Sequence, residues 1–476
     1  MDLHVSLTGR RDLYGQIYRQ VRDAILEGAL RPGDRLPPTR ELARGLSVSR
    51  ATVTAAYERL SGEGFLAPQV GAGTFVSQDT SFLPRGLRSG RPQSQLRPRR
   101  IWEETPLPDA FAGPAQFDFR TGLPDASLFP FGVWRRLVAA EMRRTAIGKG
   151  VYGDPAGHRG LREAIARHIA VSRGVLASSD DVVITNGTQQ ALDVLARVLL
   201  EPGDRVAVED PGYSPPRWLF KSLGAQVLGV PVDGEGIVVE ALHPRTKVVY
   251  VTPSHQYPLG MAMSFSRRVS LIDWVARHDA AIIEDDYDSE FRLYGRPVEP
   301  LQTLDPAGRV VYVGSFSKTM LPTMRLGFLV ATPSLRRAIQ AAKFVTDWHT
   351  PLPFQAALAR FIDEGGFARH LGRMKAIYRS RHALVRDILE REFAGMVEVV
   401  PAIAGLHISA ITPHHSSDQI RDIVRRAGRL GVAIHPLSWF TFDVEGPAGL
   451  MFGYGAIDQT RIPEGLSRLR ACFQAP

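Results

Sequence analysis

Apolar residues recur at helical spacing in the first part of the chain. In "LYGQIYRQVRDAILEG" this spacing places Ile17, Val21, Ala24 and Ile25 on one face of a helix, and Gly28 ends that helix. The stretch "PTRELARGL" predicts a short second helix. These two elements have polar residues on their other faces, as expected for helices that pack on one side only.

A third helix is predicted over "SVSRATVTAAYERLSGEG", with Ser49 as its N-cap. Its inward face would carry Val53, Ala56, Tyr57 and Leu60. The next stretch, "GFLAPQVGAGTFVS", predicts two short strands around a glycine-rich turn. Three helices followed by a hairpin indicate a winged helix-turn-helix over residues 1–79.

The pattern changes after a long polar segment. Strand-like apolar runs then alternate with helical patterns, which indicates an α/β domain whose sheet is buried on both faces. From Phe367 a long helix, the mixed stretch "VEVVPAIAGLHISAI" and a helix over "DQIRDIVRRAGRLG" predict a smaller C-terminal α+β lobe. The predicted strands are 181–185, 205–210, 247–254, 280–286, 310–314 and 325–330, and helices are predicted at 188–200 and 266–278.

Residues 80–112 separate the two parts and are rich in Pro, Gly, Ser, Gln and Arg. This composition is typical of a linker, and it leaves residues 113–476 for the α/β domain and its lobe. Six arginines lie between Arg85 and Arg100 without an acid among them. The segment is interpreted as a solvated tether, with nonspecific contact to phosphates as the alternative.

Composition narrows the class of protein. The net charge of +9 and the pI of about 9.8 indicate an anionic partner. The single cysteine, Cys472, excludes a disulfide framework and a cysteine zinc site. No stretch has the ~20 apolar residues of a membrane helix, so a soluble cytoplasmic protein without a membrane partner is predicted.

The winged helix-turn-helix predicts binding to double-stranded DNA. The third helix of such a unit enters the major groove, and the wing reaches the minor groove or the backbone. Polar residues near the start of that helix can reach bases or phosphates, and glycines let the wing approach closely. A lone arginine is more often a solvated charge. The candidate DNA-contacting residues are Arg40, Ser49, Arg50, Thr52, Thr54, Gly71 and Gly73.

Lysine is rare here, with six lysines against 52 arginines, and one of them follows a predicted strand in "YVGSFSKTMLPTMRLG". The amine of Lys318 could form a Schiff base with the aldehyde of pyridoxal phosphate (PLP). Such a site also needs an anion at the pyridinium nitrogen, an aromatic ring on the cofactor, a hydroxyl at its phenolic oxygen and donors for its phosphate.

Residues of these types follow the predicted strands, where ligands collect in open α/β sheets. The alternatives are that Asp285 and Asp286 bind a metal, which no His-rich set supports, that Tyr213 is core, or that Lys318 is an ordinary surface lysine. No metal site is predicted. The candidate cofactor residues beside Lys318 are Asp285, Tyr287, Tyr213, Gly187, Thr188, Gln189, Ser315, Ser317 and Arg325.

Two regions resemble known families. "GALRPGDRLPPTRELA", "VSRATV" and "AYERL" resemble the GntR-type DNA-binding domain. The later region resembles the fold-type I aminotransferases, and "TPSHQYPLG", "EDDYDSEFR" and "GSFSKTMLPTMRLG" resemble the MocR/GabR subfamily of GntR-type regulators. The resemblance implies a PLP-dependent, aminotransferase-like domain joined by a linker to the winged helix-turn-helix.

The resemblance also implies roles for single residues. Lys318 would carry PLP, Asp285 would pair with the pyridine nitrogen, Tyr287 would reach the phenolic oxygen, and Tyr213 would stack on the ring. Ser315, Ser317, Arg325 and the 187–189 turn would hold the phosphate. In "VYGDPAGHRGLREAIA", Tyr152 would touch the cofactor phosphate of the opposite subunit of a homodimer.

Two departures from aminotransferases bear on function. "YPLG" places Tyr257 where they carry an asparagine, which is normal for the regulator subfamily. Leu450 and Trp439 stand where an arginine for the ligand carboxylate is expected. A site without that cation should hold a carboxylate poorly. The candidates to replace the cation are Arg217, or His255 together with Gln256.

Three functions remain. The leading hypothesis is a transcriptional regulator whose PLP domain senses a small amine, an amino acid or PLP itself and alters operator binding, without physiological turnover. The second is an active aminotransferase with an appended DNA-binding domain, which Lys318 as a general acid and base would allow. The third is a DNA-binding protein whose α/β domain only dimerises.

Overall fold

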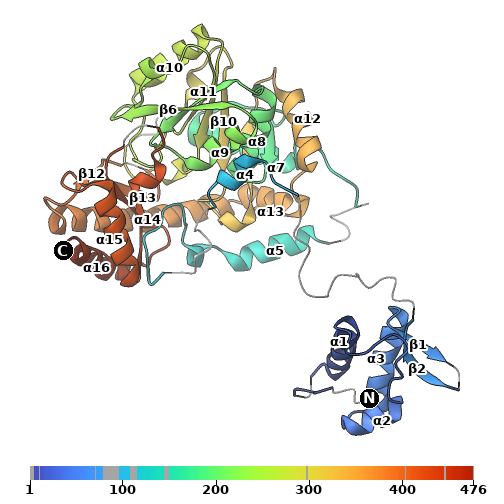
Figure 1. Cartoon of the computed structure of the whole chain (residues 1–476). Helices are drawn as coiled ribbons and strands as arrows, with labels where there is room; N and C mark the ends of the chain where they lie inside the picture. The colour runs from blue at the N-terminus through green and yellow to red at the C-terminus, as the bar shows by residue number, and fades with distance from the viewer. Residues whose placement is uncertain are drawn as a thin grey trace. The chain divides into compact units, whose positions relative to one another are not determined.

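The computed structural model describes residues 5–9, 11–69, 71–78, 96–107, 115–143, 150–295, 299–402, 404–443 and 446–474. The chain forms two compact units, residues 1–98 and residues 99–476 (Figure 1). The predicted linker falls mostly outside the described residues. Its described part contains a short helix, α4 (Arg100–Glu104), and the guanidinium of Arg99 donates to the Ser222 carbonyl at 2.9 Å.

The first unit has three helices and a two-stranded hairpin, as the sequence pattern predicts. The four residues predicted to face inward from the third helix are all buried. In the first helix Ile17, Val21 and Ile25 are buried, and Ala24 packs against the same core. The elements are α1 (Leu13–Leu26), α2 (Thr39–Gly45), α3 (Arg50–Gly62), β1 (Leu66–Gln69) and β2 (Gly73–Val76).

The second unit is built on an eight-stranded sheet of order β4-β11-β10-β9-β8-β5-β6-β7. The pairs from β10 through β9, β8 and β5 to β6 are parallel, so these strands end at the same edge. The strands are β4 (Val182–Thr185), β5 (Arg205–Asp210), β6 (Gln226–Asp233), β7 (Gly236–Ile237), β8 (Thr246–Val251), β9 (Ala281–Asp286), β10 (Val310–Ser315) and β11 (Gly327–Val330).

Helices cover both faces of this sheet, as predicted from its apolar strands. Successive strand residues face opposite sides, so Val248 packs with α8 and α9, whereas Val249 packs with α10 and α11. The helices of this unit up to the lobe are α5 (Phe131–Glu141), α7 (Arg159–Arg173), α8 (Gly187–Leu199), α9 (Ser214–Ser222), α10 (Phe265–Arg277), α11 (Leu301–Leu304), α12 (Arg336–Asp347) and α13 (Leu352–Asp363).

The predicted smaller lobe is present and lies in orange and red in Figure 1. Its sheet has the order β12-β13-β16-β15, and β14 pairs with β3 near the start of the unit. Its elements are β3 (Phe117–Asp118), α14 (Gly366–Glu392), β12 (Glu398–Val399), β13 (His407–Ile411), α15 (Ser417–Arg429), β14 (Val432–Ala433), β15 (His435–Pro436), β16 (Gly449–Gly453) and α16 (Ile462–Gln474). Among the described residues, no helix is long and apolar enough to cross a membrane.

Candidate functional site

Lys318 lies just beyond the end of β10 and is partly buried. Its Nζ donates a hydrogen bond to the carbonyl of Gly122 at 2.7 Å. Burial lowers the pKa of the Lys318 amine, although the carboxylates of Asp288 and Asp285 act in the opposite direction. A lowered pKa increases the fraction of neutral amine, which is the form that attacks an aldehyde.

Asp285 lies near the end of β9 and is 3% exposed. Its Oδ2 accepts a 2.7 Å hydrogen bond from the Tyr250 hydroxyl. Its Oδ1 is buried and has no hydrogen-bond partner within the described part of the chain. Burial raises the pKa of Asp285 to about 7. A carboxylate oxygen left unpaired beside a lysine fits the protonated ring nitrogen of PLP, which would supply both a donor and a positive charge.

Two of the predicted phosphate residues, Gly187 and Arg325, meet at the start of α8. Arg325 donates to the Asn186 carbonyl at 2.9 Å, and no side chain caps the first N–H groups of the helix. A Cβ on Gly187 would lie 2.8 Å from the Arg325 guanidinium, so only glycine allows this approach. The Ser315 hydroxyl accepts from the Ser317 amide at 3.1 Å. Free helix N–H groups, hydroxyls and a guanidinium fit a phosphate dianion.

Thr188 and Gln189, also predicted here, lie in the first turn of α8 and are partly exposed. Their backbone amides belong to the N-terminal turn, where amides have no carbonyl acceptor inside the helix.

Tyrosines line the same region. The rings of Tyr213 and Tyr257 meet edge to face, with centroids 5.7 Å apart, and Tyr257 and Tyr287 do so at 6.0 Å. Burial raises the pKa of Tyr213 to about 12, and both Asp285 and Arg325 lie close enough to influence it. Tyr257 pairs with the Thr121 hydroxyl, with 2.9 Å between the two oxygens. The predicted aromatic and anionic residues are therefore close neighbours.

Tyr287 belongs to a buried polar group that the sequence analysis did not predict. The Nδ1 atom of His255 lies 3.0 Å from Asp288 Oδ2 and 2.9 Å from the Tyr287 hydroxyl oxygen. Because the carboxylate can only accept, Nδ1 carries the proton and donates to both oxygens. The Tyr287 proton then remains available to donate to a ligand oxygen. This geometry suits a phenol that bonds the phenolic oxygen of PLP.

His407 completes this group, and its Nε2 donates to the Pro258 carbonyl at 2.9 Å. Its pKa is lowered well below the ordinary value, chiefly by burial. Ligand-type atoms of His255, Asp288 and His407 lie within 4.8 Å of one another. Asp288 lies within hydrogen-bond distance of the Nδ1 atom of His255, and Pro258 engages the Nε2 atom of His407.

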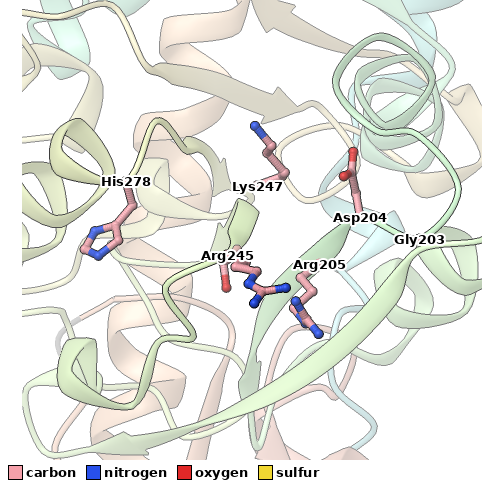
Figure 2. Close-up of a pocket in the computed structure, with 7 residues that line it drawn as sticks. Gly203, Asp204, Arg205, Arg245, Lys247 and His278 are labelled. Atoms are coloured by element: carbon pink, nitrogen blue, oxygen red, sulfur yellow. The ribbon is translucent and has the colours of Figure 1, made fainter.

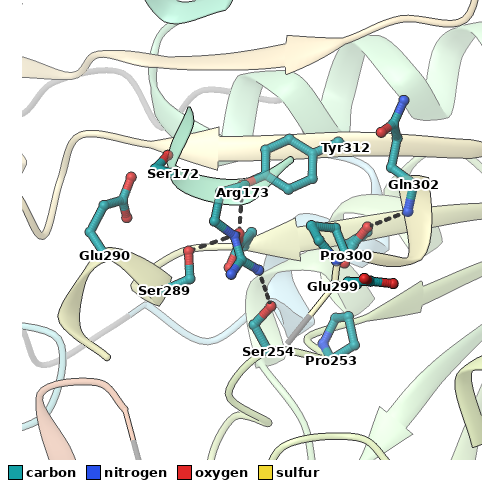
Figure 3. Close-up of polar contacts among 12 residues, drawn as sticks. Ser172, Arg173, Pro253, Ser254, Ser289, Glu290, Glu299, Pro300, Gln302 and Tyr312 are labelled. Atoms are coloured by element: carbon teal, nitrogen blue, oxygen red, sulfur yellow. Dashed lines mark hydrogen bonds and ion pairs between the residues drawn. The ribbon is translucent and has the colours of Figure 1, made fainter. Parts of the chain in front are cut away.

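Asp285 and Asp286 do not form a joint metal site, because successive residues of β9 face opposite sides of the sheet. Asp286 Oδ2 accepts from Arg173 Nε at 2.8 Å, from the Ser289 hydroxyl at 2.8 Å and from the Tyr312 hydroxyl at 2.5 Å. Figure 3 shows this network, in which Arg173 also donates to Ser254 at 2.7 Å. The network anchors α7 to β9 and so fixes the strand that positions Asp285.

Two of the candidates for binding a ligand carboxylate are engaged elsewhere, whereas His255 has a buried Nε2 without a hydrogen-bond partner among the described residues. Arg217 forms two hydrogen bonds to Asp443, at 2.9 and 2.6 Å. The side-chain amide of Gln256 donates to the carbonyls of Pro211 and Tyr257, and its oxygen accepts from the Leu259 amide.

The positions that lack the expected arginine also differ from each other in exposure. Leu450 is fully buried in β16, whereas Trp439 is exposed. Neither side chain carries a positive charge that could form an ion pair with a carboxylate.

Tyr152 lies away from the lysine. Its ring stacks on Trp348 with centroids 4.3 Å apart, and its side chain is 73% exposed. Within the described chain it reaches none of the predicted cofactor residues through a hydrogen bond. Its exposure is compatible with the predicted contact across a homodimer.

In the first unit, the predicted DNA residues lie at the surface. Ser49 caps α3 by accepting from the Thr52 amide at 3.1 Å, and its hydroxyl lies 2.8 Å from that of Thr52. Arg40 and Arg50 are exposed, and Thr54 is partly exposed. Gly71 and Gly73 have φ of +79° and +117°, which glycine adopts readily.

Sequence reasoning missed Gly122, Thr121 and Tyr250, which contact the predicted site residues. Gly122 lies 196 residues from Lys318, and a Cβ there would lie 3.0 Å from Nζ. No local pattern marks such a contact. Tyr250 lies within a predicted strand and Asp285 is a predicted site residue, but no sequence pattern indicates the hydrogen bond between them.

The chain is similar to known families over both units. It matches "Bacterial regulatory proteins, gntR family" over residues 13–76 and "Aminotransferase class I and II" over residues 127–446. It is 37% identical to the probable rhizopine catabolism regulatory protein MocR of Rhizobium meliloti, over 97% of this chain and 94% of that protein. It is 30% identical to the pyridoxine biosynthesis transcriptional regulator PdxR of Corynebacterium glutamicum, over 93% and 92%.

Among solved structures, the kynurenine aminotransferase of Pyrococcus horikoshii, crystallised in complex with PMP, superposes with a TM-score of 0.70 at 30% identity. It covers 76% of this chain and 91% of its own. The aminotransferase class I and II fold implies binding of PLP, and the unpaired Asp285 oxygen and the α8 cradle fit that cofactor. The chain therefore belongs to the MocR/GabR subfamily of GntR-type transcriptional regulators, in which a DNA-binding domain is joined to an aminotransferase-like domain.

Proposed function

We propose that this protein is a PLP-dependent regulator in which a small amine, an amino acid or PLP itself acts at Lys318 and changes operator binding. The observation that carries the proposal is the partly buried Lys318 amine, with its lowered pKa, beside the unpaired Oδ1 of Asp285. The name of PdxR connects one relative with pyridoxine biosynthesis, which supports PLP as one candidate signal.

The chain's own residues would perform five tasks. PLP supplies an aldehyde carbon that accepts an amine. Asp285 would hold a proton on the ring nitrogen, and Tyr287 would donate to the phenolic oxygen. Tyr213 would stack on the ring, while Ser315, Ser317, Arg325 and the 187–189 turn would bind the phosphate. Gly122 would accept from the Lys318 amine and keep it oriented.

The effector would act through its different affinities for the two states of the protein. An amine that takes the place of Lys318 would free the lysine side chain, and the freed amine could donate to the Gly122 carbonyl as it does here. The engaged contacts of Arg217 and Gln256 favour ligands without a carboxylate, or PLP itself.

A homodimer is part of the proposal. Tyr152 and Trp348 form an exposed aromatic stack, and Tyr152 would reach the cofactor phosphate of the partner subunit. Mixing Tyr152→Phe with Lys318→Ala chains would test this, because mixed dimers then contain one intact and one doubly altered site. PLP affinity that is independent of Tyr152 would contradict the contact.

The test of the main proposal uses the full chain. Duplexes that bind it are selected from a random-sequence library, and their affinity is measured with and without PLP and with a panel of amines. Wild type should show the absorbance of lysine-bound PLP and a change in DNA affinity with at least one ligand. Lys318→Ala should lose both and still bind DNA. If Lys318→Ala responds as wild type does, the proposal is wrong.

An active aminotransferase is the second candidate, supported by the same lysine. Transfer of the amino group from donor to keto acid over many turnovers would favour it. A single half-reaction, which ends when the bound cofactor is consumed, would favour the regulator.

A further inference from the structure

A second cluster of cations lies at the opposite edge of the large sheet. Parallel strands β5 and β8 begin at this edge, with Arg205 and Thr246 as their first residues, whereas the proposed PLP site follows the strands' ends. Each strand has six residues, or ~20 Å of rise. The cluster is therefore separate from the residues around Lys318.

A pocket of about 400 Å³ is lined here by Gly203, Asp204, Arg205, Arg245, Thr246, Lys247 and His278. Figure 2 shows Arg205 and Arg245 extending toward the same part of the pocket, with Lys247 directed away from them. Ligand pockets commonly have volumes of ~300–1,000 Å³, so this one can hold more than a single small ion.

The three cationic side chains have no counterion. Within the described ranges, no hydrogen bond or ion pair is made by the side chains of Arg205, Arg245 or Lys247. The acid in the lining, Asp204, accepts from the Glu201 amide at 2.8 Å instead. Many other arginines of this unit pair with carboxylates, such as Arg173 with Asp286. Convergent unpaired cations are costly unless an anion balances them.

Thr246 provides an independent observation. It is 1% exposed, and its hydroxyl is buried without a hydrogen-bond partner among the described residues. A buried hydroxyl without a partner costs ~1–3 kcal/mol, so such groups usually have a ligand or water to bond. Thr246 lies opposite Arg205 in the sheet, and this places its hydroxyl beside the cations.

The backbone at this point is irregular. Arg205 pairs with Thr246 and Val206 pairs with Val248, so Lys247 is an extra residue in β8. Bulges are rare between parallel strands, and they redirect side chains near functional sites. The register shift places Thr246 opposite Arg205 at the rim of the pocket, whereas the side chain of Lys247 is directed away from the two guanidiniums (Figure 2).

We propose that this pocket binds the phosphate group of a small phosphorylated molecule, at a site distinct from the one around Lys318. Two guanidiniums that converge from the first residue of β5 and from the turn before β8 can bond phosphate oxygens in pairs, and the Thr246 hydroxyl adds a donor. His278 borders the pocket, and its Nδ1 donates to the Trp274 carbonyl at 2.8 Å, which leaves Nε2 for the ligand.

The test measures inorganic pyrophosphate binding to the full chain by calorimetry, at fixed ionic strength. The protein is saturated with PLP, so that its own phosphate cradle is occupied. The Arg325→Gln variant repeats the measurement with that cradle disabled, which keeps the result independent of whether PLP binds as proposed. Pyrophosphate should still bind to the PLP-saturated protein and to the Arg325→Gln variant.

Two variants remove parts of the site, and one controls for charge. Arg205→Gln with Arg245→Gln should raise the Kd at least ~tenfold, because each lost charged hydrogen bond reduces binding. Thr246→Val should raise it severalfold without loss of stability, since the hydroxyl bonds nothing in the free chain. Arg337→Gln with Arg429→Gln removes the same charge from exposed helix surfaces and should change nothing.

Three results would overturn the proposal. Pyrophosphate could fail to bind at millimolar concentration, or the control pair could weaken binding as much as the site pair. Operator affinity could instead fall in the Arg205/Arg245 variant while pyrophosphate does not bind, and the cluster would then contact DNA. Thr246→Val guards against misfolding, because it keeps the shape of the strand.

Discussion

The Asp285 carboxylate should make the PLP-free protein less stable as the pH rises. Its pKa is raised from 3.8 to about 7 because the group is buried. A raised carboxyl pKa means that the folded state favours the neutral acid. The resulting penalty is absent below pH ~4, grows as the pH rises and is complete above pH ~7. A shift of roughly three pH units corresponds to about 4 kcal/mol.

Asp285→Asn should remove this penalty. The new amide places an N–H₂ group where Oδ1 has no partner, at a cost of ~1–3 kcal/mol that does not depend on pH. The free energy of unfolding of the variant, measured relative to that of wild type, should therefore rise by about 2 kcal/mol between pH 5.5 and pH 8.5. All six tryptophans lie in residues 99–476, so urea unfolding followed by their fluorescence reports on the second unit.

With PLP bound, wild type should be more stable than Asp285→Asn, which reverses their order without PLP. Its protonated ring nitrogen would pair with Asp285 and offset the penalty, so PLP should stabilise wild type more than the variant. Glu209→Gln is the matched control, because burial also raises the pKa of Glu209 to about 7 and its carboxylate, like that of Asp285, has one bonded and one unpartnered oxygen among the described residues, but Glu209 is not one of the proposed cofactor residues. Glu209→Gln should reduce the pH dependence of stability and leave the stabilisation by PLP unchanged. A pH-independent difference between Asp285→Asn and wild type would refute the reasoning.

Three further perturbations test single contacts. Gly122→Ala would add a Cβ 3.0 Å from the Lys318 Nζ, at a residue with φ +81°. Covalent incorporation of PLP, followed by stopped-flow absorbance, should therefore slow at least ~tenfold. An unchanged rate would contradict this. Gly405→Ala would place a Cβ 2.1 Å from a ring carbon of His255 and should therefore lower the urea midpoint. A midpoint equal to that of wild type would show that the buried histidine is not tightly packed. Arg50→Ala should weaken binding to all duplexes similarly and reduce the salt slope by about one if it contacts a phosphate; a loss confined to one sequence would indicate a base contact instead.

The sequence was informative where chemistry follows a regular apolar strand. The runs before Asp285 and Lys318 are strongly apolar, so their ends could be located and their polar residues assigned to one edge of the sheet. The interior of α3 was predictable for the same reason, because its apolar spacing matches a helix.

Other elements gave no such signal. The strand β6 was not predicted, because Gly229 and Pro231 interrupt "QVLGVPVD" and both disfavour strands. It forms because β5 offers it a parallel partner over six of its eight residues, from Arg205 opposite Gln226 to Asp210 opposite Pro231. Tertiary pairing here outweighs local preference.

Contacts between distant segments were beyond sequence reasoning as well. The hydrogen bond from Lys318 to Gly122 and the His255–Asp288–Tyr287 group depend on how the loops meet. The pairing of Arg217 with Asp443 joins residues 226 positions apart. Only the folded chain shows that this cation is already engaged.

The scarcity of lysine has a consequence for chemical selectivity. Aldehydes condense with neutral amines, whereas arginine stays protonated and does not react. Most of the positive charge of this chain is carried by arginine, and the buried amine of Lys343 is held by the carboxylate of Asp347. Excess PLP in the cell would therefore find few competing amines on this protein. At one equivalent of PLP, reduction of the adduct with borohydride should therefore mark one lysine per chain.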